Sequence, residues 1–237
     1  LVLALLSGCA STVSTGEKLE EIAQLGESPD DNYRVFYEIF VYSFCDSDGD
    51  GIGDFQGIIS KLDYLQELGI NGIWLMPIHP STTYHKYNVS DYYAIDPAYG
   101  TMEDFHALME DCKARNIKVI LDLVVNHSGY EHPWFQAAAE YLKSLPQGQQ
   151  PDPNECPYVD YYTFSKENRS GMRILNGTDW YYEAMFSPDM PDLNLGNPAL
   201  RAEIEKIMAY WMEKGVSGFR LDAAKEFYSG QVSKNAE

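Results

Sequence analysis

The chain has 237 residues, a formal net charge of −19 and 45% hydrophobic residues. This length and composition indicate one large globular domain with a sizeable core. The acidic excess argues against nucleic acid and anionic membrane surfaces as partners, and it suits neutral substrates or cations.

The N-terminal residues LVLALLSGC combine a short apolar run with a cysteine. The run is too short to cross a bilayer and is typical of the end of a secretory signal segment. The stretch Leu6-Ser7-Gly8-Cys9 resembles a bacterial lipobox, in which Cys9 would be acylated; a chance cysteine after leucines is the alternative. We therefore expect residues 1–9 to be a signal-peptide remnant and the protein to be extracytoplasmic, attached to a bacterial membrane or cell surface only through this lipid.

Polar residues dominate positions 10–32, which predicts a tether with a short helix at residues 18–25. A strand–helix alternation then begins. Residues 35–44, VFYEIFVYSF, are rich in β-branched and aromatic side chains and predict the first strand. Apolar residues at helical spacing predict a helix over residues 58–68, and Gly69 ends it.

Two further strands follow in the predicted alternation. Residues 72–78, GIWLMPI, predict the second strand. Thr101 and Asp104 have the spacing of a capping box, which predicts the start of the second helix. Residues 118–125, KVILDLVV, are nearly all apolar, as expected of a parallel strand that is buried on both faces.

The fourth strand, predicted at residues 216–221, lies much further along the chain than a usual strand–helix connection allows. The intervening residues 128–187 contain clusters of Pro, Gly, Asn and Tyr and predict a small inserted domain. A third helix is predicted to begin with Asn197 as its N-cap and Pro198 as its first residue, and Gly215 ends it.

Near the C-terminal end, Arg220 and Asp222 stand two residues apart in the apolar run GFRLD, so in a strand they share one face. A guanidinium beside a buried aspartate keeps that carboxyl ionised, as a carboxylate nucleophile requires. The alternative is a structural ion pair at a strand end. Polar residues also follow the second and third strands, among them His85, Tyr87 and His127, and such strand ends gather on one face of a barrel.

Four segments of the sequence together resemble the α-amylase family of glycoside hydrolases and transglycosylases. In chain order they are YHKYNVSDYYAIDPAYGT from Tyr84, DLVVNH from Asp122, MPDLNL from Met190 and GFRLDAAK from Gly218. The resemblance implies an α/β fold, a (β/α)8 barrel with a small domain inserted after strand three. Only the first four strands are predicted here, within residues 33–127 and 188–237, so we expect a fragment that is truncated at both ends.

The same resemblance implies roles for individual residues. Asp222 is expected to be the nucleophile that forms a covalent glycosyl-enzyme, and Arg220 to orient it and keep it charged. Tyr87 would stack on the sugar at the cleaved bond, and His127 would bind the hydroxyls of that sugar. Asp122 would support Arg220 from inside the barrel.

Two more substrate contacts follow from the resemblance, at His85 and at Lys225, the latter on the leaving-group side. The stretch YHKY resembles the YHGY of endo-acting amylases with Lys86 in place of Gly, whereas exo-acting α-glucosidases tend to have Asp where Tyr84 stands. The general acid/base glutamate and the second aspartate of the family occur after strands five and seven. Both lie beyond residue 237, so the fragment alone is expected to be inactive.

The acidic stretch DSDGDGIGD places alternating carboxylates at Asp46, Asp48 and Asp50, followed by Asp54. It follows the first part of an EF-hand loop, although the glutamate that completes such a loop is absent. Clustered carboxylates repel one another unless a hard cation neutralises them, so we expect calcium, with a solvated acidic turn as the alternative. Oligo-glucosidase-like and neopullulanase-like relatives have a similar loop, and that resemblance adds the carbonyl of Ile52 as a ligand.

The resemblance therefore implies a calcium-binding, lipid-anchored, retaining α-glucan hydrolase, an endo-acting α-amylase that cleaves α-1,4 bonds in starch or maltooligosaccharides. The alternatives within the family are a cyclomaltodextrinase, a neopullulanase, an α-glucosidase or a transglycosylase. The alternative from another class is a non-catalytic surface glucan-binding protein on the same barrel. Arg220 and Asp222 favour the enzyme, because a binding protein need not keep a nucleophile.

Overall fold

The computed structural model describes residues 34–227. The predicted signal-peptide remnant with Cys9, the tether and the helix at residues 18–25 lie outside the described residues. Within residues 34–227, no helix has both the length and the apolar character that crossing a membrane requires.

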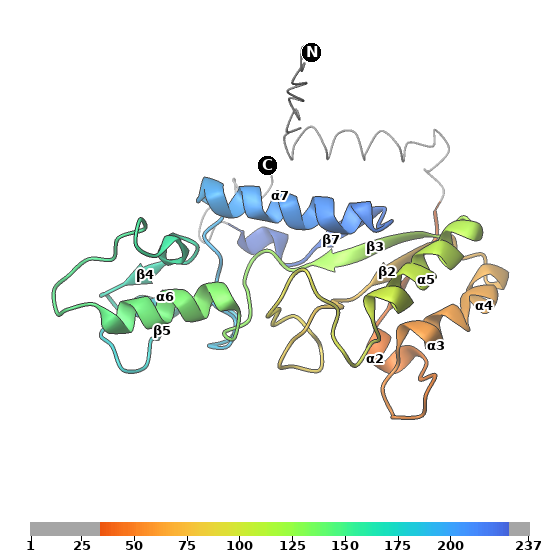
Figure 1. Ribbon diagram of the computed structural model, residues 1–237, viewed down its shortest axis with the longest axis horizontal. Coiled ribbons are helices and arrows are strands. Elements are labelled where there is room, and N and C mark those ends of the chain that lie inside the picture. Colours follow the sequence, from red (N-terminus) through yellow and green to blue (C-terminus); the bar gives the residue numbers. More distant parts are fainter. Residues whose placement is uncertain (1–33, 228–237) are drawn as a thin grey trace, which may run out of the picture.

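The main sheet has four parallel strands in the order β1-β2-β3-β7 (Figure 1). Their bounds are β1 Phe36–Ile39, β2 Gly72–Leu75, β3 Lys118–Leu123 and β7 Gly218–Leu221. Neighbouring strands pair in register, so that Leu75 lies beside Ile39 on one side and Leu121 on the other. The four parallel strands predicted from the sequence are confirmed, and each is shorter than its predicted range.

Helices between these strands share one apolar core with the sheet. They are α2 Val41–Phe44, α3 Phe55–Ile59, α4 Leu62–Glu67, α5 Met102–Ala114 and α7 Pro198–Glu213. Phe55, Leu62, Phe105 and Trp211 come from four different helices, and each is fully buried in this core. The burial of such large apolar side chains is the main force that holds the helices against the strands.

Both helix starts predicted from capping patterns are confirmed. Thr101 accepts a hydrogen bond from the amide of Asp104, whose carboxylate accepts one from Thr101 in return, so the capping box of α5 is complete. Asn197 accepts hydrogen bonds from the amides of Ala199 and Leu200 and caps α7, which begins at Pro198 as predicted.

The predicted first strand, residues 35–44, is too long. β1 ends at Ile39, and the amide of Ser43 then donates to the carbonyl of Phe40 as the chain enters α2. The aromatic side chains of this stretch stack on one another instead of alternating along a strand, with the ring centroids of Phe40 and Tyr42 5.6 Å apart. Aromatic content favours strands only where the pleated surface continues.

The single helix predicted over residues 58–68 is also wrong, because it is broken into α3 and α4. The hydroxyl of Ser60 donates to the carbonyl of Gly57, and the amide of Lys61 donates to Ile58 three residues back. A serine that bonds locally to the backbone competes with the helical ladder. Gly69 ends the second piece with a φ of +80°, as its position predicted.

A small lobe, residues 129–195, is inserted between β3 and α7 and has a core of its own. It contains α6 Pro133–Ser144, the 3-10 helix η2 Pro157–Asp160, and an antiparallel sheet of β4 Phe164–Ser165, β6 Tyr181–Glu183 and β5 Met172–Ile174. Trp134, Ile204 and Phe227 are half-buried against both cores, so the lobe packs on the main sheet through them. Figure 1 shows the lobe beside the end of α7.

Helix α6 is an element that the sequence reasoning missed. Phe135, Ala138 and Leu142 recur at helical spacing and are buried, so the signal was present in the sequence. The helix starts at Pro133 behind His132, whose ring nitrogen accepts from the amide of Trp134 in place of the usual Ser, Thr, Asp or Asn.

Candidate active site

Charged residues from β3 and β7 meet near the carboxyl ends of these strands. The register places Asp122 directly beside Arg220. The Nη1 atom of Arg220 donates to both carboxylate oxygens of Asp122 at 3.1 Å and to Oδ1 of Asp222 at 2.5 Å. The guanidinium also lies 4.8 Å from the ring centroid of Trp74 on β2. One arginine is therefore fixed between two carboxylates. The spacing of two predicted that Arg220 and Asp222 share a face, and the family resemblance implied the contact with Asp122.

Asp122 is the buried member of this cluster, with a fully buried side chain. It accepts hydrogen bonds from the hydroxyl of Tyr87 at 2.9 Å and from the indole nitrogen of Trp74 at 3.3 Å. Burial raises the pKa of Asp122 to about 6, and the nearby Arg220 charge opposes that rise. The positive charge of Arg220 thus favours the charged form of Asp122, and the carboxylate of Asp122 in turn holds the guanidinium in place.

Asp222 is the accessible member of the cluster, with a side chain that is 19% exposed. It follows β7, and its amide donates to the carbonyl of Leu123 at the end of β3. Its carboxylate is held through Oδ1 by Arg220, so a rigid strand and a charge-assisted hydrogen bond orient it. This is what attack by a carboxylate on a bound electrophile requires.

His127 is buried beside this cluster with an unsatisfied polar atom. The residue is 2% exposed, and its Nε2 has no hydrogen-bond partner among the described residues. Burial lowers the pKa of His127 to about 4, although the charge of Asp222 opposes the shift, so the imidazole is neutral at pH 7. A buried polar atom of this kind calls for a partner, which a ligand hydroxyl can supply.

A turn between β2 and α5 carries His85 and Tyr87 to the same place. Nδ1 of His85 lies 3.2 Å from the amide of Tyr87, which donates to it, and 3.3 Å from the hydroxyl oxygen of Thr83. Burial raises the pKa of Tyr87 above its ordinary value, so its hydroxyl stays protonated and donates to Asp122. Burial also lowers the pKa of His85.

Two residues near the cluster were missed by sequence reasoning. Trp74 donates to Asp122 and faces Arg220, but its place in an apolar strand looks like ordinary core. Phe186 is 52% exposed on the small lobe, and its ring centroid lies 5.4 Å from that of His127. An aromatic residue in a loop gives no periodic signal, so only the structure reveals it.

Lys225 lies on the 3-10 helix η3, Ala224–Glu226, just after Asp222. Its side chain is 86% exposed, and its ammonium is 3.8 Å from a carboxylate oxygen of Glu226. The predicted contact of Lys225 with a sugar on the leaving-group side stays a prediction.

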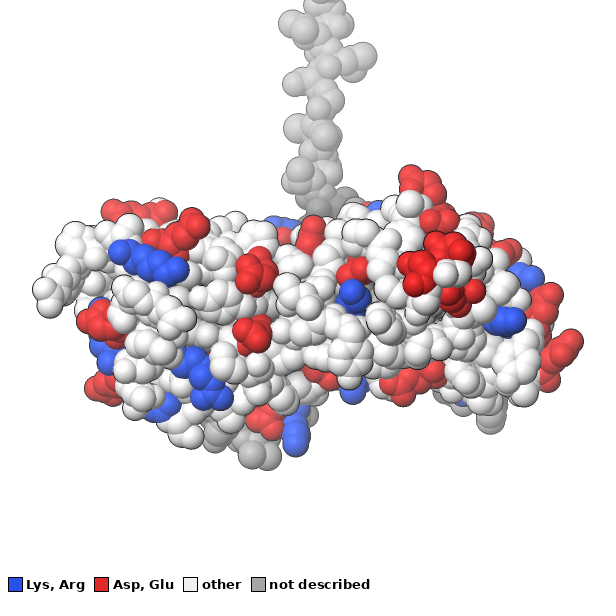
Figure 2. All heavy atoms as spheres, turned by 90° about the horizontal axis from the view of Figure 1, so that it is seen from below, with Lys and Arg blue, Asp and Glu red and all other residues white. Residues whose placement is uncertain are grey.

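The acidic loop, residues 46–54, brings three of its carboxylates together. Single oxygens of Asp46, Asp48 and Asp50 lie within 4.8 Å of one another, and all three residues are exposed. Amides within the loop, among them those of Gly49 and Gly51, donate to Asp46 and lower its pKa. Three ionised groups this close fit the oxygen donors that calcium prefers. Acidic side chains crowd the same end of the molecule in Figure 2.

Asp54 stands apart from that group of three. Its Oδ1 accepts from the amide of Gly57 at 2.6 Å and so caps α3, while its Oδ2 accepts from the amide and the hydroxyl of Ser47. Asp54 and the carbonyl of Ile52 stay predicted calcium ligands.

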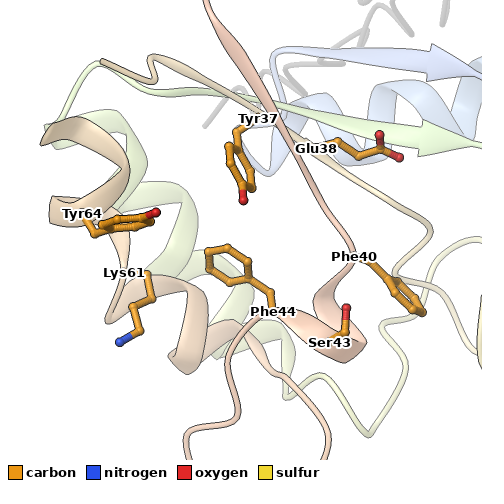
Figure 3. Close-up of a pocket in the computed structure, with 7 residues that line it drawn as sticks. All are labelled: Tyr37, Glu38, Phe40, Ser43, Phe44, Lys61 and Tyr64. Atoms are coloured by element: carbon orange, nitrogen blue, oxygen red, sulfur yellow. The ribbon is translucent and has the colours of Figure 1, made fainter. Parts of the chain in front are cut away.

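The structure also has a cavity of about 510 Å³ between β1, α2 and α4. Figure 3 shows Tyr37, Phe44 and Tyr64 pointing into it, whereas Glu38 points away. No predicted site residue lines this cavity. β1 is an edge strand of the sheet, and the cavity lies beside that open edge.

The catalytic-domain model of the α-amylase family matches residues 38–236 of the chain. The chain belongs to the α-amylase family. The catalytic domain of that family is a (β/α)8 barrel, and the four parallel strands described here form part of one. The recognition made from the four sequence segments is thereby confirmed.

Individual members of the α-amylase family resemble this chain over most of the chain's own length. It is 50% identical to "Alpha-amylase 3" of Dictyoglomus thermophilum over 206 residues, which cover 86% of this chain and 38% of the relative. It is 42% identical to an oligo-1,6-glucosidase of Parageobacillus thermoglucosidasius, covering 79% of this chain and 34% of that enzyme. The solved structure of Eubacterium rectale Amy13B superposes with a TM-score of 0.86 and 54% identity, covering 91% of this chain and 42% of that one. The chain therefore spans less than half the length of each of these relatives.

Proposed function

We propose that the protein to which this chain belongs is an endo-acting, retaining α-glucan hydrolase that cleaves α-1,4-glucosidic bonds in starch or maltooligosaccharides. The observation that carries the proposal is the Arg220–Asp222 hydrogen bond of 2.5 Å, which holds an accessible carboxylate just beyond the end of strand β7. Similarity to an α-amylase of D. thermophilum supports the same activity. A non-catalytic glucan-binding protein would not need this pair.

In the proposed reaction, an oxygen of Asp222 attacks the anomeric carbon while the glycosidic bond breaks. The leaving oxygen takes a proton from the general acid of the family, a glutamic acid about 5–5.5 Å from the nucleophile. Water then gives a proton to the same glutamate and attacks the anomeric carbon, so the bond to Asp222 breaks and its carboxylate is restored. Arg220 holds that carboxylate in place through its hydrogen bond, and His127 offers its unpaired Nε2 to a sugar hydroxyl.

Endo-action is favoured by Tyr84, which lies next to His85 in the turn between β2 and α5. Tyr84 is 66% exposed, and its ring centroid lies 6.2 Å from that of Phe40 and 5.3 Å from that of His85. An exposed aromatic ring offers a stacking surface to a further sugar, whereas a carboxylate there would bind the hydroxyls of a chain end. The oligo-1,6-glucosidase similarity keeps an exo-acting α-glucosidase as the second candidate.

The products of a long substrate distinguish the two candidates. With the full-length enzyme and amylose, endo-cleavage lowers the viscosity of the solution long before much reducing sugar appears, and early products are maltooligosaccharides of mixed length. Release of glucose alone from the start would show exo-action. A full-length protein that binds amylose without cleaving it would be the glucan-binding protein.

Calcium is the proposed cofactor, held by Asp46, Asp48 and Asp50 with the carbonyl of Ile52 and Asp54. The support is the closeness of the first three carboxylates. The ion would neutralise the loop and fix it against α3, which Asp54 caps. Its role would be structural and separate from bond cleavage.

A lipid at Cys9 is the proposed anchor, which would place the enzyme outside the cytoplasm on a bacterial membrane or cell surface. The support is the sequence Leu6-Ser7-Gly8-Cys9. The full-length protein should incorporate labelled fatty acid, and Cys9→Ser should abolish both the label and sedimentation with membranes. Wild-type protein without label would refute the anchor.

A further inference from the structure

The loop between β2 and α5 buries a pair of opposite charges that the proposed mechanism does not use. The ammonium of Lys86 lies 2.6 Å from Oδ2 of Asp96, and the two side chains are only 10% and 9% exposed. The ammonium also lies 5.4 Å from the ring centroid of Tyr99, which is itself buried. Desolvating two charges is costly, and specifying a single arrangement of the chain is the best-attested role of such pairs.

The backbone at Lys86 is in a conformation that its side chain disfavours. Its φ is +65°, in the left-handed region where a Cβ crowds the backbone. Its amide donates to the carbonyl of Thr83 and closes a tight turn. Glycine is the residue that such a position favours, and glycine stands there in the YHGY motif. A lysine that accepts this strain does so with its side chain fixed in a buried ion pair.

Hydrogen bonds hold Asp96, the acidic partner of Lys86, in place. Its amide donates to the carbonyl of Ile78 just beyond β2, and its Oδ1 accepts from the amide of Ala98. The first contact ties Asp96 to the chain that leaves β2, and the second is a local turn that orients its carboxylate. The Lys86 side chain therefore links the turn to the carboxyl end of β2.

The residues on either side of Lys86 are the two proposed substrate contacts of the turn. Tyr87 donates to Asp122 of the charged cluster, and its amide donates to His85. We infer that the buried Lys86–Asp96 ion pair holds the turn of residues 83–87 in place, so that Lys86 is a positioning residue for His85 and Tyr87. This inference rests on the proposed function, because it assigns the pair to the same substrate site.

Removal of the pair without leaving a buried charge tests this inference in the full-length protein. Lys86→Met alone leaves Asp96 unpaired, and we expect it to destabilise the fold. The double variant Lys86→Met, Asp96→Asn leaves no unpaired charge and should melt close to the wild-type temperature. Lys206→Met is the matched control, because it removes an exposed ion pair with Glu203 on α7.

Two readouts separate positioning from stability. In the double variant we expect kcat/KM on maltoheptaose to fall about ten- to a hundredfold, as displaced substrate contacts do. Amides of residues 81–89 should exchange with deuterium faster than in the wild type, whereas the control should match the wild type in both respects.

Wild-type kcat/KM and wild-type exchange in the double variant would overturn the inference and leave the pair a purely structural contact. If the wild type itself cleaves no α-glucan, the proposed function fails. The exchange rates over residues 81–89 then still decide whether the pair holds the turn, because that measurement needs no substrate.

Discussion

The charged cluster of Asp122, Arg220 and Asp222 and the acidic loop of residues 46–54 both gather carboxylates, but they balance the charge differently. The cluster contains its own cation, Arg220 on strand β7, which donates to both aspartates. In the acidic loop, the carboxylates of Asp46, Asp48 and Asp50 lie close together and accept hydrogen bonds from backbone amides of the loop. The cluster therefore carries a cation of its own, whereas we propose that the loop takes a cation from solution.

Replacement of the proposed nucleophile, Asp222, should have the largest effect on activity, because the charged cluster and not the acidic loop is proposed to carry the reaction. Asp222→Asn conserves size but cannot form the covalent intermediate, so kcat on maltooligosaccharides should fall at least about a thousandfold in the full-length enzyme. Asp63→Asn, which alters an exposed partner of Arg115, should leave kcat unchanged. Steady-state kinetics of both variants decide the point, and near-normal kcat in Asp222→Asn would refute the assignment.

Replacement of Arg220, the cation of the charged cluster, should have the next largest effect on activity. Arg220→Met removes the positive charge that opposes the raised pKa of Asp122, and it removes the donor that orients Asp222. We expect kcat to fall about a hundredfold and the acid limb of the rate–pH profile to move to higher pH. Arg115→Met, at an exposed ion pair, is the control. An unshifted acid limb would show that Arg220 does not keep Asp122 in its charged form.

Burial of a neutral histidine beside the cluster should make stability depend on pH. The pKa of His127 is lowered to about 4 from an ordinary value near 6.5. The folded state therefore resists protonation, and the resulting stability is present above pH 6.5 and is lost as pH falls toward 4. This difference corresponds to about 3 kcal/mol. Urea unfolding of His127→Gln at pH 7 and pH 4.5 should show a smaller loss than the wild type; equal losses would contradict the assignment.

The acidic loop should respond to its cation with a smaller change, in stability rather than chemistry. A chelator should lower the melting temperature of the full-length enzyme by about 5 °C, and added calcium should restore it, because the ion binds only the folded state. Asp48→Ala should abolish the response. A melting temperature that is the same with and without chelator would show the loop to be a solvated acidic turn.

The sequence predicted the parts of the fold that depend on local patterns. The caps at Thr101 and Asn197 follow from side chains that bond to nearby amides, and both are confirmed. The C-terminal end of β1 could not be predicted, because Phe40 and Tyr42 are residue types that favour strands. Their packing on each other is visible only in the folded structure. Helix α6 had a readable apolar spacing that the surrounding Pro- and Gly-rich sequence obscured.

The residues of the candidate site likewise divide into those that local sequence patterns predict and those that they do not. The Arg220–Asp222 contact follows from a spacing of two in a strand, and Asp122 joins it through the strand register. Trp74 and Phe186 reach the cluster from another strand and from the small lobe, and nothing local in the sequence marks them. The buried partner of Lys86 depends on the path of a loop, which the sequence does not specify.

Direct capture of the covalent intermediate tests the central claim, that Asp222 is a nucleophile held by Arg220. The full-length enzyme is incubated with a fluorinated α-glucosyl fluoride that slows hydrolysis of a glycosyl-enzyme, then digested and examined by mass spectrometry. The account predicts one added glycosyl unit on the peptide that contains Asp222, and none in Asp222→Asn. A glycosyl unit on a different carboxylate, or turnover of maltooligosaccharides with inversion at the anomeric carbon, would contradict it.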